Sequence, residues 1–283
     1  MEQFASGWKR NYYGKGDVSV YRLNRGGSGA PGEPCRVFGA NVLMLVYGDT
    51  FWATYTTGDN TGLIATDSMK NFIQRETQNY TGNDLEDYCW FLGATFLDTY
   101  SQVEGIQVSA SELPYGALEK GVGFTPSGNE RATARIELQK RTVVEVVSGL
   151  RGFRLLRLGG SAFRGFVRDQ YTTLPDLVDR PLHMWLDLEW SYTSPDQACS
   201  EGRVTAAVRR IVHQVFEAFD SGSIQQVIHQ MGTRVLSEIP SIEEIHLEAD
   251  NRTWDTIAER SGEGGIYTDP RPPYGCLGLR LRR

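Results

Sequence analysis

The chain has few of the residues that bind metals or form disulfides. Its 283 residues include four cysteines and four histidines. The cysteines form no Cys-x-x-Cys pair, and the histidines do not stand at ligand spacing: Cys35, Cys89, Cys199, Cys276, His183, His213, His229 and His246. These absences argue against a zinc site and against a disulfide framework. The sequence therefore predicts that any chemistry runs without a metal.

Long apolar runs and an excess of positive charge are also missing. No stretch approaches the roughly 20 apolar residues of a membrane span, and the first ten residues lack the apolar core of a secretory signal. The net charge of −6 argues against general nucleic-acid binding. No Gly-x-Gly-x-x-Gly or Walker loop follows an expected strand, so a nucleotide cofactor is not supported. We expect a cytoplasmic protein without membrane or nucleic-acid partners, in which an anionic substrate would need a local cationic pocket.

What the sequence does contain is a pattern of elements that occurs twice. Its length favours roughly two domains. Strands are expected over 18–23 and 36–47, helices over 66–73 and 85–103, and strands over 105–113 and 132–147, with a border at Gly149. The second half gives strands over 153–158, 184–190, 242–247 and 274–281, with helices over 204–219 and 224–235. Hairpin-linked strands with helices grouped between them predict an α+β fold with antiparallel sheets. Residues 26–34 form a Gly/Pro-rich stretch that resembles a hairpin connection.

Two expected helix starts carry groups that suit a planar anion. Thr66 or Asp67 can cap the first helix, and Ser223-Ile-Gln-Gln226 reads as a capping box. A helix start leaves backbone N–H donors unpaired and carries partial positive charge. The alternative is that both are ordinary capped helices without a ligand.

A long irregular stretch, 161–180, lies in the middle of the chain. It keeps neither the helix nor the strand period, and it is too aromatic to be disordered. Phe163 and Arg180 could be brought together there to bind a flat anion, because a ring stacks on its face and a guanidinium meets its edge oxygens. The alternative is a surface loop with a buried phenylalanine and a solvated arginine.

Lys15 and Asn251 are less specific when taken alone. A lysine beside a hydroxyl such as Thr66 can relay a proton if its pKa is lowered, but most surface lysines are only solvated. Asn251, which follows an expected strand, is most often a turn residue.

Taken together and in order, these stretches resemble the urate oxidase (uricase) family over nearly the whole chain. The matching motifs are Tyr13-Gly-Lys15, Ala65-Thr-Asp-Ser-Met-Lys70, Phe163-Arg-Gly-Phe-Val-Arg-Asp-Gln-Tyr-Thr-Thr173 with Asp179-Arg180, Ser223-Ile-Gln225 and Asn251-Arg-Thr253. The resemblance implies two tandem ββααββ units, called T-folds, over 1–149 and 150–283. It also implies a tunnel-shaped homotetramer that oxidises urate with molecular oxygen to 5-hydroxyisourate and hydrogen peroxide, without metal or organic cofactor.

The same resemblance assigns roles to individual residues. Phe163 would stack on the purine, and Arg180, Gln225 and the N–H of Ile224 would hold one edge of it. Thr66 and the backbone of Asp67 would bind the other end. Asn251 would lie where oxygen, water and then peroxide reside, and Lys15 with Thr66 would relay protons. The resemblance places Lys15, Thr66 and Asp67 in one subunit, and the other residues in its neighbour.

One position departs from the family pattern. Many members have histidine two residues after the asparagine, where this chain has Thr253. Thr253 is therefore expected either to orient a water or to have no part in a relay made of Lys15 and Thr66. Two other functions remain open. One is a T-fold purine-binding protein that has lost oxidation; the other is a T-fold hydrolase acting on pterins, which would want zinc ligands or a catalytic Cys/His set.

Overall fold

The computed structural model describes residues 11–24, 35–140, 142–200, 204–218, 220–260 and 264–283. The chain forms two compact units, Met1–Ser148 with Tyr192–Gly202, and Gly149–Ser191 with Arg203–Arg283. The 26–34 stretch and Phe219 lie outside the described residues. The expected division into T-folds at 1–149 and 150–283 stays a prediction. It differs from the two compact units in one respect, because Tyr192–Gly202 belongs to the first unit.

The first unit is built on antiparallel strands in the order β1-β2-β3-β6. Their bounds are β1 (Tyr13–Asn24), β2 (Arg36–Tyr47), β3 (Gly105–Glu112) and β6 (Arg131–Gln139). β2 alternates buried and half-buried residues along much of its length, as expected for a strand with one face on the core. Two short strands, β4 (Tyr115–Ala117) and β5 (Phe124–Pro126), form a separate hairpin that the sequence pattern did not predict.

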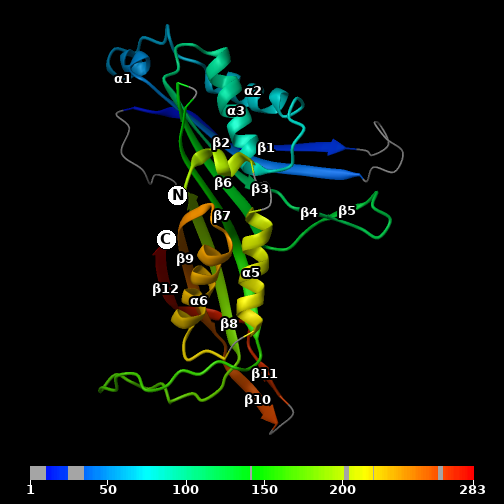
Figure 1. Ribbon diagram of the computed structural model, residues 1–283, viewed down its shortest axis with the longest axis vertical. Helices are drawn as coiled ribbons and strands as arrows, with labels where there is room; N and C mark the ends of the chain where they lie inside the picture. Colours follow the sequence, from blue (N-terminus) through cyan, green and yellow to red (C-terminus); the bar gives the residue numbers. More distant parts are fainter. Residues whose placement is uncertain (1–10, 25–34, 141, 201–203, 219, 261–263) are drawn as a thin grey trace. The chain divides into compact units, whose positions relative to one another are not determined.

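Helices cover one face of these strands (Figure 1). The helical elements of this unit are η1 (Asp49–Phe51), α1 (Trp52–Thr56), α2 (Thr66–Glu76), α3 (Leu85–Thr99) and α4 (Pro195–Ser200), of which α2 and α3 pack directly on strands. α3 packs on β3 and β6, and α2 packs against β1. The helix expected over 66–73 is present in α2, whose buried residues Met69, Phe72 and Ile73 lie on one face.

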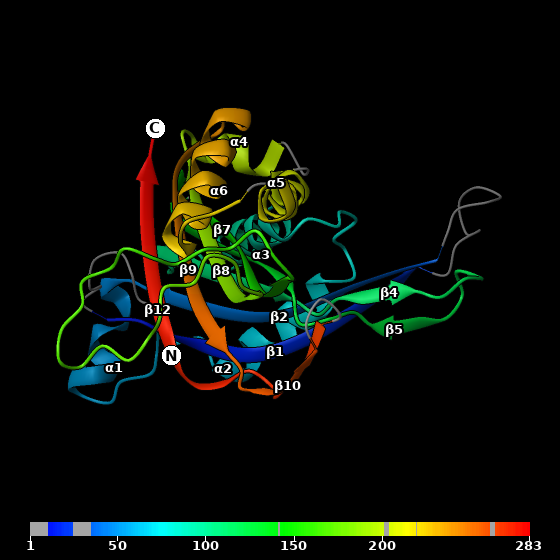
Figure 2. The same cartoon turned by 90° about the horizontal axis from the view of Figure 1, so that it is seen from below.

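The second unit has strands in the order β7-β8-β9-β12, with β9 and β12 antiparallel. The bounds are β7 (Thr142–Arg157), whose first residues belong to the first unit, β8 (Leu182–Tyr192), β9 (Ile242–Thr253) and β12 (Arg271–Arg282). α5 (Val204–Ala218) and α6 (Ile224–Glu238) lie side by side, with α6 on β9 and β12 (Figure 2). The hairpin of β10 (Thr256–Arg260) and β11 (Gly264–Tyr267) follows β9 and was not predicted.

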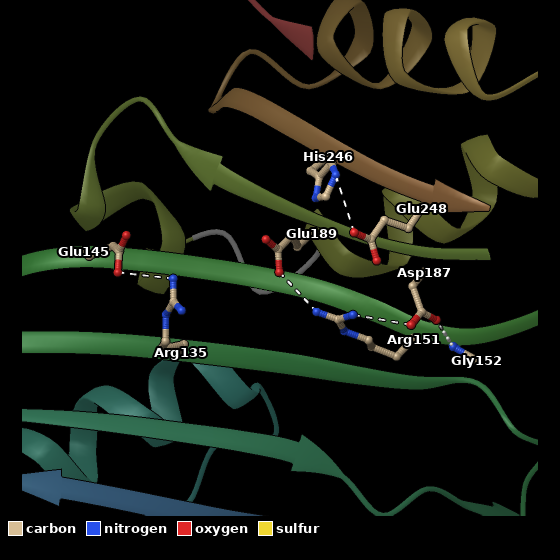
Figure 3. A network of polar contacts seen from close by, with 8 residues as sticks. All are labelled: Arg135, Glu145, Arg151, Gly152, Asp187, Glu189, His246 and Glu248. Atoms are coloured by element: carbon tan, nitrogen blue, oxygen red, sulfur yellow. Dashed lines mark hydrogen bonds and ion pairs between the residues drawn. The ribbon is translucent and has the colours of Figure 1, made fainter. Parts of the chain in front are cut away.

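The face of β8 away from its buried residues carries charge. Leu186 and Leu188 are buried, whereas Asp187 and Glu189 point the other way. Arg151 lies between those two carboxylates, at 3.3 Å from Asp187 and 3.2 Å from Glu189 (Figure 3). The strand alternation thus separates a core face from a polar face.

Two expectations about strand limits were wrong. The expected strand over 132–147 is broken after Gln139, where Lys140 adopts a left-handed backbone (φ 45°). The strand expected over 153–158 is the end of a longer strand, because β7 runs from Thr142 to Arg157 and passes through Gly149, the first residue of the second compact unit. Gly152 absorbs a positive φ of 82° inside β7, and its N–H donates to Asp187 at 2.7 Å. Glycine at position 152 permits this local irregularity inside the strand.

The mixed α and β structure with antiparallel strands agrees with the predicted α+β fold. The assignment of two tandem T-folds stays a prediction. Among the described residues, no helix is both long enough and apolar enough to span a bilayer.

Candidate functional site

Thr66 and Asp67 occupy the first turn of α2, but neither caps it. The N-cap is Ala65, and no side chain of the described residues accepts a hydrogen bond there. The prediction of a Thr66 or Asp67 cap was therefore wrong by one or two positions. An alanine cap leaves the first-turn N–H groups of the helix available, which is the arrangement that can bind an anion.

The side chain of Asp67 is bonded within its own helix. Its carboxylate accepts from Lys70 at 2.5 Å and from Asn71 at 3.0 Å. The hydrogen bond from Lys70 is the largest cause of the lowered pKa of Asp67, and the charge of Lys15 also contributes. The carboxylate is thus held by side chains downstream, which leaves the backbone N–H of Asp67 as the group that could face a ligand.

The start of β1 is tied to the start of α2. Gly14 passes so close to β2 that a Cβ would lie 1.9 Å from the carbonyl oxygen of Met44, so only glycine fits before Lys15. Tyr13 accepts a hydrogen bond from the N–H of Ile64 at 3.0 Å, two residues before Thr66. Together with the effect of Lys15 on the pKa of Asp67, this places Lys15, Thr66 and Asp67 in one neighbourhood of the first unit.

In the second unit, Phe163 and Arg180 do come together. The guanidinium carbon of Arg180 lies 5.9 Å from the centroid of the Phe163 ring. Phe163 is fixed by a backbone pair with Leu177, with hydrogen bonds of 2.8 and 2.9 Å. The 161–180 stretch is therefore an ordered loop closed on itself. Phe166 and Val167 are not part of a helix or a strand.

Arg180 is partly withdrawn from water. Burial lowers its pKa, and no opposing cause accompanies it. Its Nε is buried and has no hydrogen-bond acceptor among the described residues. A guanidinium in this state gains from an added anionic or carbonyl partner, which distinguishes Arg180 from a solvated surface arginine.

The N-terminus of α6 is adjacent to this loop. Ser161 and Ser221 form a parallel bridge, in which the N–H of Ala162 donates to Ser221 O at 2.8 Å. α6 begins three residues after Ser221, with Ile224 buried and Gln225 exposed. The structure thus brings the Phe163–Arg180 pair and the Ile224–Gln225 turn into one region of the second unit.

The predicted capping box of α6 is present in a modified form. The Oγ of Ser223 accepts from the N–H of Gln226 at 3.2 Å. The side-chain oxygen of Gln226 accepts from the N–H of Gly222 at 2.8 Å, one residue earlier than in the usual motif. Both Gln225 and Gln226 are exposed, but the side chain of Gln226 is used by the cap.

Asn251 and Thr253 lie at the end of β9, which is longer than predicted. Asn251 pairs with Gly275 and Thr253 with Arg271, and the irregularity between these pairs falls in β12. β9 itself is regular, so both side chains share the face of Leu247 and Ala249, which are buried. That is the face on which α6 packs.

Arg252, between them, points to the opposite face. Its guanidinium carbon lies 3.8 Å from the centroid of Trp185 and 3.6 Å from that of Tyr274. It also donates to Asp250 at 2.7 Å. Stacking of Arg252 on the Trp185 and Tyr274 rings fixes the end of β9, and with it the position of the neighbouring Asn251. In the sequence, Arg252 stands out only as part of the Asn251-Arg-Thr253 motif, because nothing local marks it as stacked.

The candidate residues fall into two groups, one in each unit. The first unit holds Lys15, Thr66 and Asp67, and the second unit holds Phe163, Arg180, Ile224, Gln225, Asn251 and Thr253. Their ligand roles stay predictions.

Comparison with known proteins gives one family. The uricase family model matches residues 11–144 and 146–276. A uricase of Haloferax volcanii is 37% identical over 96% of this chain and 97% of its own length. The uric acid degradation bifunctional protein of Bacillus sp. (strain TB-90) is also 37% identical over 93% of this chain, but the chain spans only 58% of that relative's length.

Solved structures agree. The crystal structure of Bacillus sp. TB-90 urate oxidase superposes with a TM-score of 0.84 at 36% identity, covering 96% of this chain and 99% of that one. Uricase from Arthrobacter globiformis gives a TM-score of 0.85 at 26% identity, over 98% and 95% of the two chains. The chain therefore belongs to the uricase family.

Proposed function

We propose that this protein is a urate oxidase. Urate, oxygen and water would give 5-hydroxyisourate and hydrogen peroxide: two electrons leave the purine and reduce oxygen to peroxide, while water supplies the added hydroxyl. The observation that carries the proposal is the Phe163–Arg180 pair, in a chain of this family, with a partly buried guanidinium that still lacks an acceptor for its Nε among the described residues.

In the second unit, binding would use both the face and the edge of the purine. Phe163 stacks on the ring plane, and Arg180 donates to a carbonyl and a ring nitrogen along one edge. The side-chain amide of Gln225 both donates and accepts, so it can complete the hold on that edge, and the N–H of Ile224 adds a backbone donor at a helix start. Urate carries negative charge at neutral pH, which suits a guanidinium whose Nε lacks an acceptor among the described residues.

In the first unit, the opposite end of the purine would meet the start of α2. The N–H of Asp67 and the hydroxyl of Thr66 donate to that end, because Ala65 leaves the first turn uncapped. The hydroxyl of Thr66 also passes a proton between the purine and Lys15. Asn251 holds oxygen or water beside the ring, and Thr253 orients a water.

We propose, as membership of the uricase family suggests, that the site is completed between subunits. Tandem T-fold units over 1–149 and 150–283 would assemble as a tunnel-shaped homotetramer, with Lys15, Thr66 and Asp67 from one subunit and the other residues from its neighbour. A cytoplasmic location also stays a prediction from the sequence.

The runner-up is a purine-binding protein of the same fold that has lost oxidation. The feature that favours it is Thr253, at the position where many members have histidine. The pterin hydrolase has less support, because among the described residues no three His, Cys, Asp or Glu side chains are grouped as metal ligands.

One assay separates these proposals. Urate is added to the purified protein in air, without added metal, and urate absorbance and peroxide are followed together. The proposed function predicts that urate disappears and an equal amount of peroxide forms. Binding of urate without turnover would support the purine-binding alternative, and neither binding nor turnover would contradict both.

A further inference from the structure

Arg157, the last residue of β7, joins three segments of the second unit. One terminal nitrogen donates to Gly160 O at 2.6 Å and to Ser221 Oγ at 3.0 Å. The other donates to Phe216 O at 3.0 Å. A single guanidinium therefore contacts the start of the 161–180 loop, the turn before α6 and the last part of α5.

The surroundings of Arg157 are closely packed. Gly160 adopts φ 73°, and a Cβ there would lie 2.4 Å from Oδ1 of Asp220, so no larger residue fits without movement. Asp179 accepts from the N–H of Ser161 at 3.2 Å. Burial is the main influence on the pKa of Arg157, which it lowers, while the charges of Asp220 and Asp179 act in the opposite sense. The carboxylates of Asp179 and Asp220 thus favour the charged form of the Arg157 guanidinium.

The segments joined by Arg157 are those that carry one edge of the proposed site. Phe163 follows Gly160 by three residues, and Arg180 follows Asp179 directly. Ile224 and Gln225 follow Ser221 by three and four residues. The backbone bond from Ser221 N–H to Gly160 O, at 2.9 Å, joins the same two segments, and Arg157 reinforces that junction from the side.

We propose that Arg157 is a positioning residue of the urate site: by binding Gly160 and Ser221 with one guanidinium, it holds the Phe163–Arg180 loop and the start of α6 in register. This inference rests on the proposed function, since the groups it positions are those assigned to urate. Arg157 itself touches no substrate. Its effect is on the relative placement of the two donors that share one edge of the purine.

Lysine should not replace it. An ammonium keeps the charge between Asp179 and Asp220, but it lacks the planar fork that meets acceptors on separate segments. Small displacements of groups that bind together lower affinity steeply. Loss of an interaction made equally in the bound and transition states raises KM with little change in kcat. The expected signature of Arg157→Lys is therefore weaker urate binding, with turnover at saturating urate nearly retained.

Three variants test the inference. Arg157→Lys removes the fork, and Ser221→Ala removes one acceptor while the backbone stays intact. Arg151→Lys is the matched control, an arginine on the same strand whose ion pairs with Asp187 and Glu189 lie on the polar face. Urate affinity is measured by calorimetry without oxygen, where no turnover occurs, and kcat is measured in air. Amide hydrogen exchange reports Ala162 and Ser221, whose N–H groups make the bonds across the junction.

The inference predicts at least a tenfold rise in the Kd of urate for Arg157→Lys, with kcat within threefold of the parent. Ser221→Ala should give a smaller rise in the Kd of urate. The double variant should bind about as weakly as Arg157→Lys alone, because the bond that Ser221→Ala removes, from Arg157 to Ser221 Oγ, is already lost in Arg157→Lys. Exchange at Ala162 and Ser221 should accelerate in both single variants and stay unchanged in Arg151→Lys.

The inference is overturned if exchange and Kd in Ser221→Ala and Arg157→Lys match those of Arg151→Lys. Ser221→Ala carries the test should Arg157→Lys fail to fold. Failure of the proposed function looks different: the unmodified protein would then neither bind nor oxidise urate. In that case the exchange rates alone decide whether Arg157 holds the two segments, and unchanged rates overturn its positioning role.

Discussion

Arg180 is a charged side chain held partly out of water beside Phe163, and this has a cost for the unliganded fold. Withdrawing a charged group from water without full compensation destabilises a protein. The surroundings of Arg180 supply burial but no counter-charge that affects its pKa. Arg180 therefore contributes little to the stability of the fold. This fits the proposal that it binds the substrate, which would supply an acceptor for its Nε.

The first prediction concerns that acceptor. Arg180→Lys keeps the charge but loses the two-pronged contact, which is worth roughly 1.5–3 kcal/mol when charged groups are involved. The Kd of urate without oxygen should therefore rise at least tenfold, whereas Arg168→Lys, in the same loop and with its own partner Asp176, should leave it unchanged. Equal affinity in Arg180→Lys and the parent would remove Arg180 from the site.

Lys15 is proposed to take part in the proton relay and not in binding the purine. Lys15→Met should lower kcat far more than it raises the Kd of urate, because a relay acts on the barrier and not on the bound ground state. Lys120→Met is the control, an exposed lysine of the same unit that is not among the candidate residues. Normal turnover of Lys15→Met at saturating urate would sink this assignment.

Thr253 stands where many family members have an imidazole. If its hydroxyl orients a water, Thr253→Val should slow the chemical step and spare binding, while Thr253→His should preserve or raise the rate. Single-turnover kinetics under air separate the chemical step from release. Full activity of Thr253→Val would show that the position takes no part in proton transfer.

At the scale of elements, the two helices of the proposed site begin differently. α6 has Ser223 as a working cap, whereas Ala65 leaves the start of α2 without a side-chain acceptor. A missing cap costs about 1 kcal/mol of stability. The uncapped start is thus less stable than it could be, and the same free donors are those proposed to bind urate.

This difference gives a prediction with opposite signs for stability and function. Ala65 has an extended backbone (φ −58°, ψ 136°) that suits a cap. Ala65→Ser should therefore raise the free energy of unfolding by about 0.5–1 kcal/mol, while its hydroxyl competes for the donors and weakens urate binding. Denaturant unfolding and anaerobic titration measure the two effects. A more stable variant with unchanged affinity would mean that these N–H groups do not bind urate.

Elements with a strong period were predictable from sequence, and irregular ones were not. α5 and α6 follow from apolar side chains at helical spacing, and β2 follows from its alternation. The limits of β6 and β7 were missed because Lys140 forms a left-handed turn without glycine, and because the strand expected over 153–158 belongs to a strand that begins at Thr142. Tertiary pairing decided both cases against the local pattern.

The site was predictable only in part for a related reason. Phe163 and Arg180 stood out as an aromatic and a cationic residue in a long irregular stretch, and the structure brings them together. Arg157 and Arg252 carry no such signal, since an arginine at a strand end looks the same whether it is solvated or bridges three segments. Their importance lies in contacts between residues distant in sequence, such as Arg157 with Ser221.

At the scale of the whole molecule, the candidate residues are divided between the two compact units. The first unit holds the proposed relay, and the second holds the proposed purine-binding edge. Neither set alone can both bind urate and move its protons. The central claim is therefore that one urate oxidase site combines the Lys15 group of one subunit with the Arg180 group of another.

Subunit mixing tests that claim most directly. Chains with Lys15→Met and chains with Arg180→Ala are refolded or expressed together, and peroxide formation from urate is measured against each variant alone. Random pairing leaves about a quarter of shared sites with both residues intact, by counting over a symmetric interface. The account predicts mixed-chain activity near that fraction of the unmodified protein and well above either parent. Mixed tetramers that form and stay as inactive as the parents would contradict it.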